Sequence, residues 1–323
     1  LGRAIEAAER ETGRVDGFFP AWLREALPGG VEGLRALTAE PPVTLRANAL
    51  RLTREDLAEW LWDEGIESRP TEHSPWGLTL DRRANIFRTD AFREGAFEMQ
   101  DEASQLVALL CAPRRGDIIV DSCAGAGGKT LALSAMTEDT GTLVAFDTAS
   151  FRLEALRERA ARAGIRSLQI APLDAAGEAR RLRLTGGADI VLVDAPCSGT
   201  GVLRRNPDIA WKLREDDLPR LVAEQEQLLR TYAPLVKPGG RLVYAVCSLL
   251  APEGTGQIAR FLRDHPEFRR VDAGGVLKTC GVRPGTLVTR GDFAVDPLRH
   301  GLDGFYAAVL ERGKQAGGSA VRE

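Results

Sequence analysis

The 323-residue chain is predicted to fold as an α/β protein with a mostly parallel sheet. Short apolar segments alternate with helical segments from about residue 96 onward, and polar or reactive residues follow several of the apolar segments. Short apolar strands separated by helices are typical of a parallel sheet with helices on both faces. Such sheets bind ligands at the carboxyl ends of their strands. The sequence therefore predicts a functional site at that edge.

Residues 1–95 are expected to form a separate N-terminal module with helical and α+β character. The helical pattern of the first 40 residues is broken at Pro20 and at the Pro-Gly-Gly stretch 28–30. Further elements are expected as a strand at 43–50, a helix at 53–65 that Thr53 caps, and a strand at 77–81.

Residues 96–314 are expected to form the main domain, and residues 315–323 a flexible tail. The expected helices span 100–112, a segment starting at Gly127, 150–163, 215–236 and 254–264. The expected strands span 117–123, 141–147, 168–172, 188–194, 240–248 and 304–312. This alternation is the pattern of consecutive strand–helix units.

The composition limits the class of protein. A net charge of −3 and a pI near 5.9 argue against electrostatic binding of nucleic acid by the whole surface, although a local basic patch stays possible. The five cysteines show no CxxC pairing and the three histidines are scattered, so neither a disulfide framework nor a metal site is predicted. We expect a monomer in a reducing cytoplasm, without a membrane span.

The glycine-rich segment VDSCAGAGGKT at 120–130 ends a strand and opens a helix. A phosphate-binding P-loop would need glycine at the position of Cys123. A dinucleotide fingerprint could start at Gly125 and Gly127, but it would need glycine at the position of Thr130. The third interpretation is an ordinary tight turn between strand and helix, and this segment alone does not decide among the three.

Two acidic residues at later strand ends favour a nucleoside-bearing cofactor. Asp147 ends the second strand of the main domain, where a carboxylate can accept both ribose hydroxyls. Asp174 follows the third strand, where it can meet an adenine amino group. This layout suits an adenosine cofactor without a pyrophosphate, and it predicts S-adenosylmethionine (SAM).

The cysteines fall into two groups. A free cysteine is usually a small buried hydrophobe, and Cys111 in an apolar helix is interpreted in this way. Cys197 in DAPCSGTG (194–201) and Cys247 in VYAVCS (243–248) instead follow two core strands, and each precedes a serine. Because both thiols are expected at one ligand-binding edge, we favour a chemical role for them over packing.

These segments resemble the Sun-type RNA (cytosine-5)-methyltransferases, and among them the bacterial 16S rRNA enzymes of the Fmu type. The resemblance covers nearly the whole chain and rests on LRANALRLTREDL, GAFEMQDEASQLVA, DSCAGAGGKT, FDTASFRLEAL, DAPCSGTGVLRRNPDIAW, LVKPGGRLVYAVCSLLAPE and HGLDGFYAAVL, in this order. It implies a Rossmann-like SAM-dependent methyltransferase sheet, mostly parallel, with seven strands and an antiparallel last strand.

The resemblance also implies roles for individual residues. Cys247 would be the nucleophile that adds to carbon 6 of cytosine, and Cys197 would help to release the product. Asp194, beside the thiols, would hydrogen-bond the ring edge near nitrogen 3. The implied cofactor contacts are Cys123, Ala124, Gly125, Ala126, Gly127, Gly128, Lys129, Asp147, Arg152, Asp174 and Asp194.

The chain departs from the family pattern near the proposed nucleophile. Ala126 stands where the family commonly has proline, and Val246 replaces the usual threonine before Cys247. The usual acidic stretch after that motif reads PEGTG here, which leaves only Glu253. These changes surround the thiols and bear on the substrate more than on the cofactor.

The sequence thus predicts a SAM-dependent RNA methyltransferase that forms 5-methylcytosine, with rRNA as the expected substrate. Two alternatives stay open: the same fold and cofactor acting on a small molecule or peptide, and a non-catalytic RNA-binding assembly factor. Several basic residues are candidates for an RNA path, with a solvated surface as the alternative for each: Arg46, Arg51, Arg54, Arg204, Arg205, Lys212 and Arg214.

Overall fold

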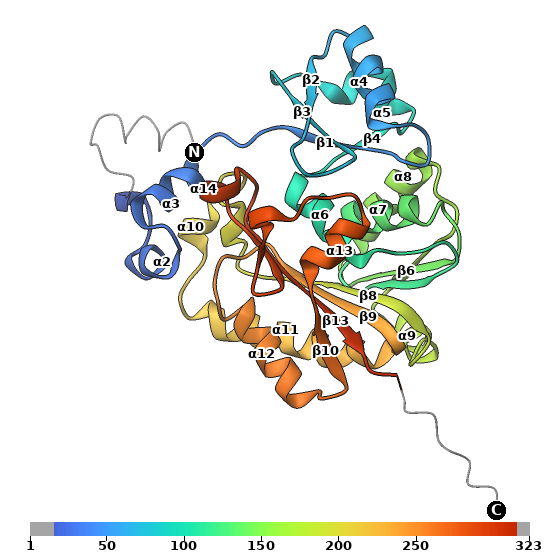
Figure 1. Cartoon of the computed structure of the whole chain (residues 1–323), viewed down its shortest axis with the longest axis vertical. Coiled ribbons are helices and arrows are strands. Elements are labelled where there is room, and N and C mark those ends of the chain that lie inside the picture. The colour runs from blue at the N-terminus through green and yellow to red at the C-terminus, as the bar shows by residue number, and fades with distance from the viewer. Residues whose placement is uncertain (1–15, 315–323) are drawn as a thin grey trace, which may run out of the picture.

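The computed structural model describes residues 16–314, so the tail expected at 315–323 and the start of the N-terminal helical pattern lie outside the described residues. Two sheets organise the described chain (Figure 1). A four-stranded sheet has the order β2-β3-β1-β4, and a nine-stranded sheet has the order β11-β12-β13-β9-β8-β5-β6-β7, with β10 paired to β13. The expected single sheet for the main domain is therefore confirmed.

The small sheet is antiparallel and carries its own core. Its strands are β1 (Thr44–Ala47), β2 (Ser68–Pro70), β3 (Gly77–Leu80) and β4 (Phe97–Met99), so it extends beyond residue 95. Helix α4 (Arg54–Asp63) begins with the expected cap, because Thr53 and Asp56 form a reciprocal capping box. Helices α4 and α5 (Asp90–Arg93) cover the sheet through buried residues such as Leu57 and Ala91.

The large sheet is parallel from β7 to β9 and antiparallel beyond. The six expected strands appear as β5 (Ile118–Asp121), β6 (Thr142–Asp147), β7 (Leu168–Pro172), β8 (Ala188–Asp194), β9 (Val236–Val246) and β13 (Phe305–Arg312). The last of these inserts antiparallel beside β9, as expected. Nine strands form instead of the expected seven, because the short segments β10 (Phe268–Val271), β11 (Val288–Thr289) and β12 (Asp292–Val295) extend the antiparallel side.

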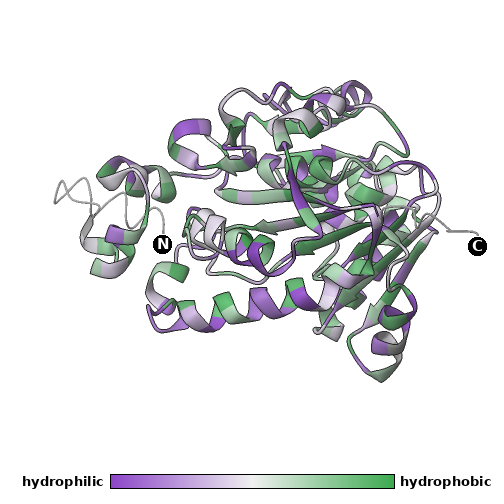
Figure 2. Cartoon of the chain, turned by 60° about the horizontal axis from the view of Figure 1, so that its bottom comes forward, coloured by the Kyte–Doolittle hydropathy of each residue, from purple (hydrophilic) through white to green (hydrophobic). Residues whose placement is uncertain are grey.

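Alternate residues of the large sheet face two separate cores. The first core takes in α6 (Glu102–Cys111), α7 (Gly128–Met136), α8 (Ser150–Ala163) and α13 (Ala273–Thr279). The second takes in α11 (Asp217–Tyr232) and α12 (Thr255–Asp264). In β8, for example, Leu192 faces the first core and Val193 the second. Figure 2 shows these strands mostly in green, the colour of hydrophobic residues, with helices that mix green and purple around them. The expected sheet with helices on both faces is therefore confirmed.

The N-terminal helices pack against segments near the cysteine turns. Helix α2 (Ala21–Ala26) and α3 (Gly30–Thr38) are separated at the Pro-Gly-Gly stretch, where Gly29 takes the left-handed conformation (φ 85°). Leu23 and Leu34 share a core with Leu203 and Leu250, which follow the two cysteine motifs. The N-terminal segment therefore braces the loops after β8 and β9. Short helices α9 (Ala175–Arg183), α10 (Ile209–Lys212) and α14 (Pro297–His300) complete the domain.

Hydrogen bonds from β1 and the turn after it dock the small module on the main domain. Arg46 is 3% exposed, and its Nη1 donates to Gln100 and to the carbonyl of Gly128 (2.6 Å). Burial lowers the pKa of Arg46 to about 10. Arg51 donates to carbonyls at the end of α8. These two arginines help to hold the module in place. Arg46 is buried, which removes it as a candidate for an RNA path, whereas Arg51 is exposed and stays a candidate.

A buried ion-pair network joins the segment after Cys197 to two other parts of the chain. Asp303, fully buried, pairs with Arg204 (2.6 Å) and with Arg205, and Arg205 also pairs with Asp101 at the start of α6 (2.9 Å). Burial, with the neighbouring Asp303 charge, raises the pKa of Asp101 to about 6. The ion pairs of Arg204 and Arg205 give both residues an internal bracing role, and a place on an RNA path stays a prediction for them.

The network predicts a large loss of stability when its centre is removed. Asp303→Ala leaves two guanidinium groups without their shared carboxylate, and we expect the free energy of unfolding to fall by about 3–5 kcal/mol. Urea denaturation followed by circular dichroism measures this change. As a control, Asp208→Ala breaks the exposed pair with Lys212 and should leave the midpoint unchanged. Equal midpoints for both variants would contradict the bracing role.

Candidate functional site

The strand-end residues predicted from the sequence meet at one edge of the large sheet. Strands β6, β5, β8 and β9 are neighbours and parallel, so their carboxyl ends face the same side. Asp121 is aligned with Leu192, and Asp194 is aligned with Ala245 in β9. The registers bring the ends of four strands to similar levels, which gathers their polar residues.

The glycine turn after β5 is shaped by two residues with positive φ. Gly125 (φ +54°) and Gly127 (φ +88°) adopt backbone conformations that favour glycine. A Cβ on Gly127 would lie 2.1 Å from Leu156, whereas a Cβ on Gly125 would meet nothing within 4 Å. The turn is therefore packed against α8 on one side and open on the other, which leaves its backbone accessible to a ligand.

Asp147 holds this turn through its carboxylate. Its Oδ2 accepts a hydrogen bond from the Gly125 amide (2.8 Å), and its Oδ1 accepts one from the Ala149 amide (2.8 Å). Each carboxylate oxygen can accept more than one hydrogen bond, so both oxygens keep acceptor capacity. Asp147 is therefore oriented by the backbone at the point where the sequence placed a ribose.

The other predicted cofactor residues occupy different surroundings. Arg159 donates to the Ala126 carbonyl (2.6 Å), and Arg46 donates to the Gly128 carbonyl, so the turn is also held from behind. Asp174 is exposed and caps α9 by accepting from the Gly177 amide (2.9 Å). Arg152 is exposed on the first turn of α8, with its guanidinium 5.8 Å from the Phe151 ring.

Lys129 and Asp194 link the glycine turn to the first cysteine turn. The Lys129 ammonium, on α7, lies 2.6 Å from Asp194 Oδ2 at the end of β8, and it also lies over the Phe305 ring. Burial alone would lower the pKa of Lys129, but the charges of Asp194 and Cys247 raise it above its ordinary value. Lys129 is therefore a fixed positive charge between the two turns.

The two cysteines predicted to act together are in contact. Cys197 Sγ and Cys247 Sγ lie 3.4 Å apart and share a hydrogen bond. The pKa of the Cys197 thiol lies well above its ordinary value, mainly because of this hydrogen bond with Cys247 and secondly because of burial. Cys123 is not part of the pair: its sulfur lies 3.7 Å from Ser122 Oγ, and burial raises its pKa. Cys111 packs in the core, as expected.

Two buried acids at this edge were noted in the sequence but given no role. Glu253 is fully buried and accepts hydrogen bonds from the residues that follow both cysteines. The sequence showed it only as the acid that remains after the Cys247 motif. Asp121 ends β5, and its Oδ2 accepts from Thr130 (2.7 Å) while its buried Oδ1 has no partner among the described residues. Burial raises the pKa of Asp121 to about 7.

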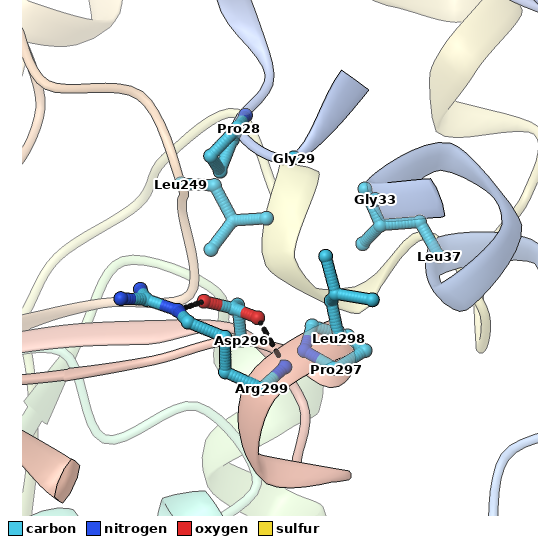
Figure 3. A pocket seen from close by; sticks show the side chains of 9 residues that line it. All are labelled: Pro28, Gly29, Gly33, Leu37, Leu249, Asp296, Pro297, Leu298 and Arg299. Atoms are coloured by element: carbon cyan, nitrogen blue, oxygen red, sulfur yellow. Dashed lines mark hydrogen bonds and ion pairs between the residues drawn. The ribbon is translucent and has the colours of Figure 1, made fainter. Parts of the chain in front are cut away.

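A cavity of about 310 Å³ lies beside this edge, between α3, the turn after Cys247 and α14 (Figure 3). Leu37, Leu249 and Leu298 line it, and its carboxylate, Asp296, already pairs with Arg299 (2.6 Å). The cavity contains neither cysteine and no unpaired charge, so it is distinct from the strand-end site.

The raised pKa of Asp121 predicts a specific pH dependence. Its folded-state pKa of about 7 lies above the ordinary value near ~3.9, so the folded state binds a proton that the unfolded chain releases. The stability from this group is present below pH ~4 and is lost as the pH rises through ~7. Asp121→Asn should therefore raise the melting temperature at pH 8 more than at pH 5. Thermal unfolding at both pH values tests this, and an equal change at both would contradict it.

The large sheet with its flanking helices has the Rossmann-like fold of methyltransferases. The chain belongs to the 16S rRNA methyltransferase RsmB/F family, whose profile matches residues 108–311. The ferredoxin-like domain of RsmF/B-like methyltransferases matches residues 19–87, which confirms the resemblance of the N-terminal module. None of the helices within residues 16–314 combines the length and apolar character needed to cross a membrane.

Known relatives agree with this family. Ribosomal RNA small subunit methyltransferase B of Pasteurella multocida is 36% identical over 91% of this chain and 65% of the relative. The Vibrio cholerae protein of the same name is 33% identical over 96% and 69%. The chain thus spans about two thirds of these relatives. The structure of NSun6 from Pyrococcus horikoshii with SFG has a TM-score of 0.77 at 20% identity, covers 92% of this chain and 99% of that one, and shows the shared fold.

Proposed function

We propose that this protein transfers a methyl group from SAM to carbon 5 of a cytosine in rRNA through a covalent cysteine adduct. The observation that carries this proposal is the 3.4 Å contact of the Cys197 and Cys247 thiols beside the Lys129–Asp194 pair. A thiol nucleophile, with a second thiol and a fixed cation beside it, suits addition to a pyrimidine ring and later elimination. We also propose a reducing cytoplasm, where thiols stay free, and a monomer.

The residues at the glycine turn fit an adenosine cofactor. The open side of Gly125 admits the close approach of a ligand, and the oriented carboxylate of Asp147 can accept two ribose hydroxyls. The exposed carboxylate of Asp174 can accept a hydrogen bond from an adenine amino group. The turn from Cys123 to Lys129, with Arg152 and Asp194, would complete the contacts. When bound, SAM supplies an electrophilic methyl group.

Each of the protein's own groups has a separate role in the reaction at the cytosine ring. The Cys247 thiolate adds to carbon 6, which makes carbon 5 nucleophilic enough to take the methyl group. The Lys129 ammonium, held in place by the Asp194 carboxylate, stabilises the negative charge that develops on the ring near nitrogen 3. A water molecule acting as base takes the proton of carbon 5, the electron pair of that C–H bond restores the double bond between carbons 5 and 6, and the Cys247 sulfur leaves carbon 6 as a thiolate. Cys197, in contact with that sulfur, assists this release.

The target nucleotide has to leave its stack to reach these groups. Cys247 lies at a strand end inside the protein fold and is partly buried, so the base must be unstacked or flipped. Most of the arginines proposed for the RNA path serve internal contacts. We therefore propose that RNA binding relies on fewer phosphate contacts, which predicts a modest dependence on salt.

Removing Asp147 should weaken cofactor binding. Asp147→Ala removes two charge-assisted acceptors of about 1.5–3 kcal/mol each, and the Gly125 amide loses its partner. We expect the Kd for SAM in calorimetry to rise more than tenfold. Glu154→Ala, which removes an exposed carboxylate of α8, is the matched control. An unchanged Kd for Asp147→Ala would exclude Asp147 from the cofactor site.

The two cysteines should behave differently when each is removed. Cys247→Ala should abolish methyl transfer and any covalent complex, because the attacking sulfur is gone. Cys197→Ala should still add and methylate, but release is impaired, so an RNA–protein complex that survives denaturation should accumulate. A denaturing gel with labelled SAM and substrate RNA measures both effects.

Cys280→Ala serves as the control, since this thiol contacts the Leu109 carbonyl (3.5 Å) and is separate from the site. It should methylate RNA without a trapped complex. Trapping by Cys247→Ala but not by Cys197→Ala would reverse the two roles. If neither variant traps RNA and both methylate it, the adduct mechanism is wrong.

A further inference from the structure

Glu253 is a buried acid for which the proposed chemistry has no use. It lies in the turn between β9 and α12, and none of its surface is exposed. A charged side chain is rarely buried without several partners, because desolvation of a carboxylate is costly. The contacts of Glu253 therefore indicate what it contributes.

All the side-chain contacts of Glu253 come from donors. Its Oε1 accepts from the Ser198 amide (2.8 Å) and from Gln225 Nε2 (2.9 Å). Its Oε2 accepts from the hydroxyls of Ser198 and Ser248, each at 2.5 Å. Four donors therefore converge on the two oxygens of one carboxyl group, which leaves it fully satisfied as an acceptor. Ser198 follows Cys197 and Ser248 follows Cys247, so one carboxylate holds both cysteine turns.

Further hydrogen bonds make this link rigid. Thr200 Oγ1 lies 3.2 Å from each of the two serine hydroxyls and accepts from the Leu249 amide (3.0 Å). Gln225 Nε2 also donates to the Pro196 carbonyl (3.0 Å), on the other side of Cys197. The distance between the two thiols is thus fixed by a network centred on Glu253.

The charges around the thiol pair are unequal. The carboxylate of Glu253 accepts from the amide that directly follows Cys197, whereas the Lys129 ammonium interacts with Cys247 and is held by Asp194. Tyr244 also faces this region, and its hydroxyl donates to the Glu253 carbonyl (2.7 Å). The charge of Glu253 contributes, after the Cys247 contact and burial, to the raised pKa of Cys197.

We propose that Glu253 is a positioning residue that locks the two cysteine turns together and disfavours a negative charge on Cys197, so that Cys247 is the sulfur that attacks. This inference rests on the proposed function, since it explains how two adjacent thiols take different roles. A negative charge beside Cys197 disfavours a second negative charge there, and the cation beside Cys247 favours one. The nucleophile is then selected by its surroundings before any substrate binds.

Thiol reactivity tests this without RNA or cofactor. The native protein is treated with a small amount of iodoacetamide, and the initial alkylation rates of Cys247 and Cys197 are measured by mass spectrometry. Alkylation follows the thiolate fraction, so the wild-type protein should react faster at Cys247. Glu253→Gln keeps the shape of the side chain and removes its charge. The network can adapt to this change, because the serine hydroxyls can turn to accept from the new amide group. The ratio of the two rates should fall about tenfold, as for one pKa unit.

Two controls make the outcome decisive. Asp189→Asn changes a carboxylate that accepts from the Ile118 amide (2.9 Å) at the opposite end of β8, and it should leave the ratio unchanged. Alkylation of the buried Cys111 reports unfolding. If Glu253→Gln exposes Cys111, the Glu253→Asp variant is measured in its place. The shorter aspartate keeps the negative charge but moves it away from Cys197, so the ratio of the two rates should fall about twofold.

An unchanged ratio in a folded Glu253→Gln or Glu253→Asp protein would overturn the proposal, as would a wild-type protein that reacts faster at Cys197. Neither of these two results depends on whether the wild-type protein transfers a methyl group. If instead Glu253→Gln lowers the ratio of alkylation rates but the wild-type protein shows no methyl transfer, the role of Glu253 is supported and the proposed function is refuted. The two failures are therefore distinguishable.

Discussion

The parallel pairing of β8 with β9 is the constraint on which the site depends. Its register aligns Val193 with Tyr244 and Asp194 with Ala245, so the two strands end at the same level. The turns that carry Cys197 and Cys247 begin from these ends and bring sulfur atoms 50 residues apart in the chain to 3.4 Å. An antiparallel pairing would send the two turns to opposite edges of the sheet. The contact between the two thiols thus depends first on the strand topology and only then on the identity of the side chains.

Strand pairing sets the level of the turns, but buried polar contacts hold their shape. Asp303 fixes the segment after Cys197 from one side through Arg204 and Arg205, and Glu253 joins both turns from within. Each acid is fully buried and satisfied by several donors. Irregular backbone near an active edge needs such partners, because it lacks the regular hydrogen bonds of a helix or strand.

The sequence was sufficient to predict which residues gather at the carboxyl edge of the large sheet. The alternation of short apolar strands and helices predicted a parallel sheet, and that topology predicted that Asp147, Asp194 and both cysteines share one edge, which the structure confirms. Their chemical roles remain predictions. Strand ends could be located because apolar strands stop abruptly at polar residues, a signal that is local in the chain.

The partners of charged residues could not be predicted in this way. Arg204 and Arg205 lie in a basic stretch that suggested RNA, yet their partner Asp303 is about 100 residues away, and nothing local in the sequence reports such a pairing. The same holds for Glu253, whose partners Ser198 and Gln225 are distant in the chain. The additional strands β10, β11 and β12 were missed because they are short and lie at the antiparallel side, where pairing with β13 and its neighbours stabilises them.

Lys129 is the point at which the two halves of the site meet. It belongs to the helix that starts at the glycine turn, and its ammonium binds Asp194 at the start of the cysteine turn. A buried cation in this position couples the two turns electrostatically, since a charge that develops beside either one acts on the same ion pair. Substitutions of Lys129 would therefore mix effects on the proposed cofactor site and on the thiols. Of these turns, Asp147 contacts only the glycine turn, and Cys247 lies only in the second cysteine turn. Variants of these two residues can therefore separate an effect on the proposed cofactor binding from an effect on the proposed methyl transfer, which variants of Lys129 cannot do.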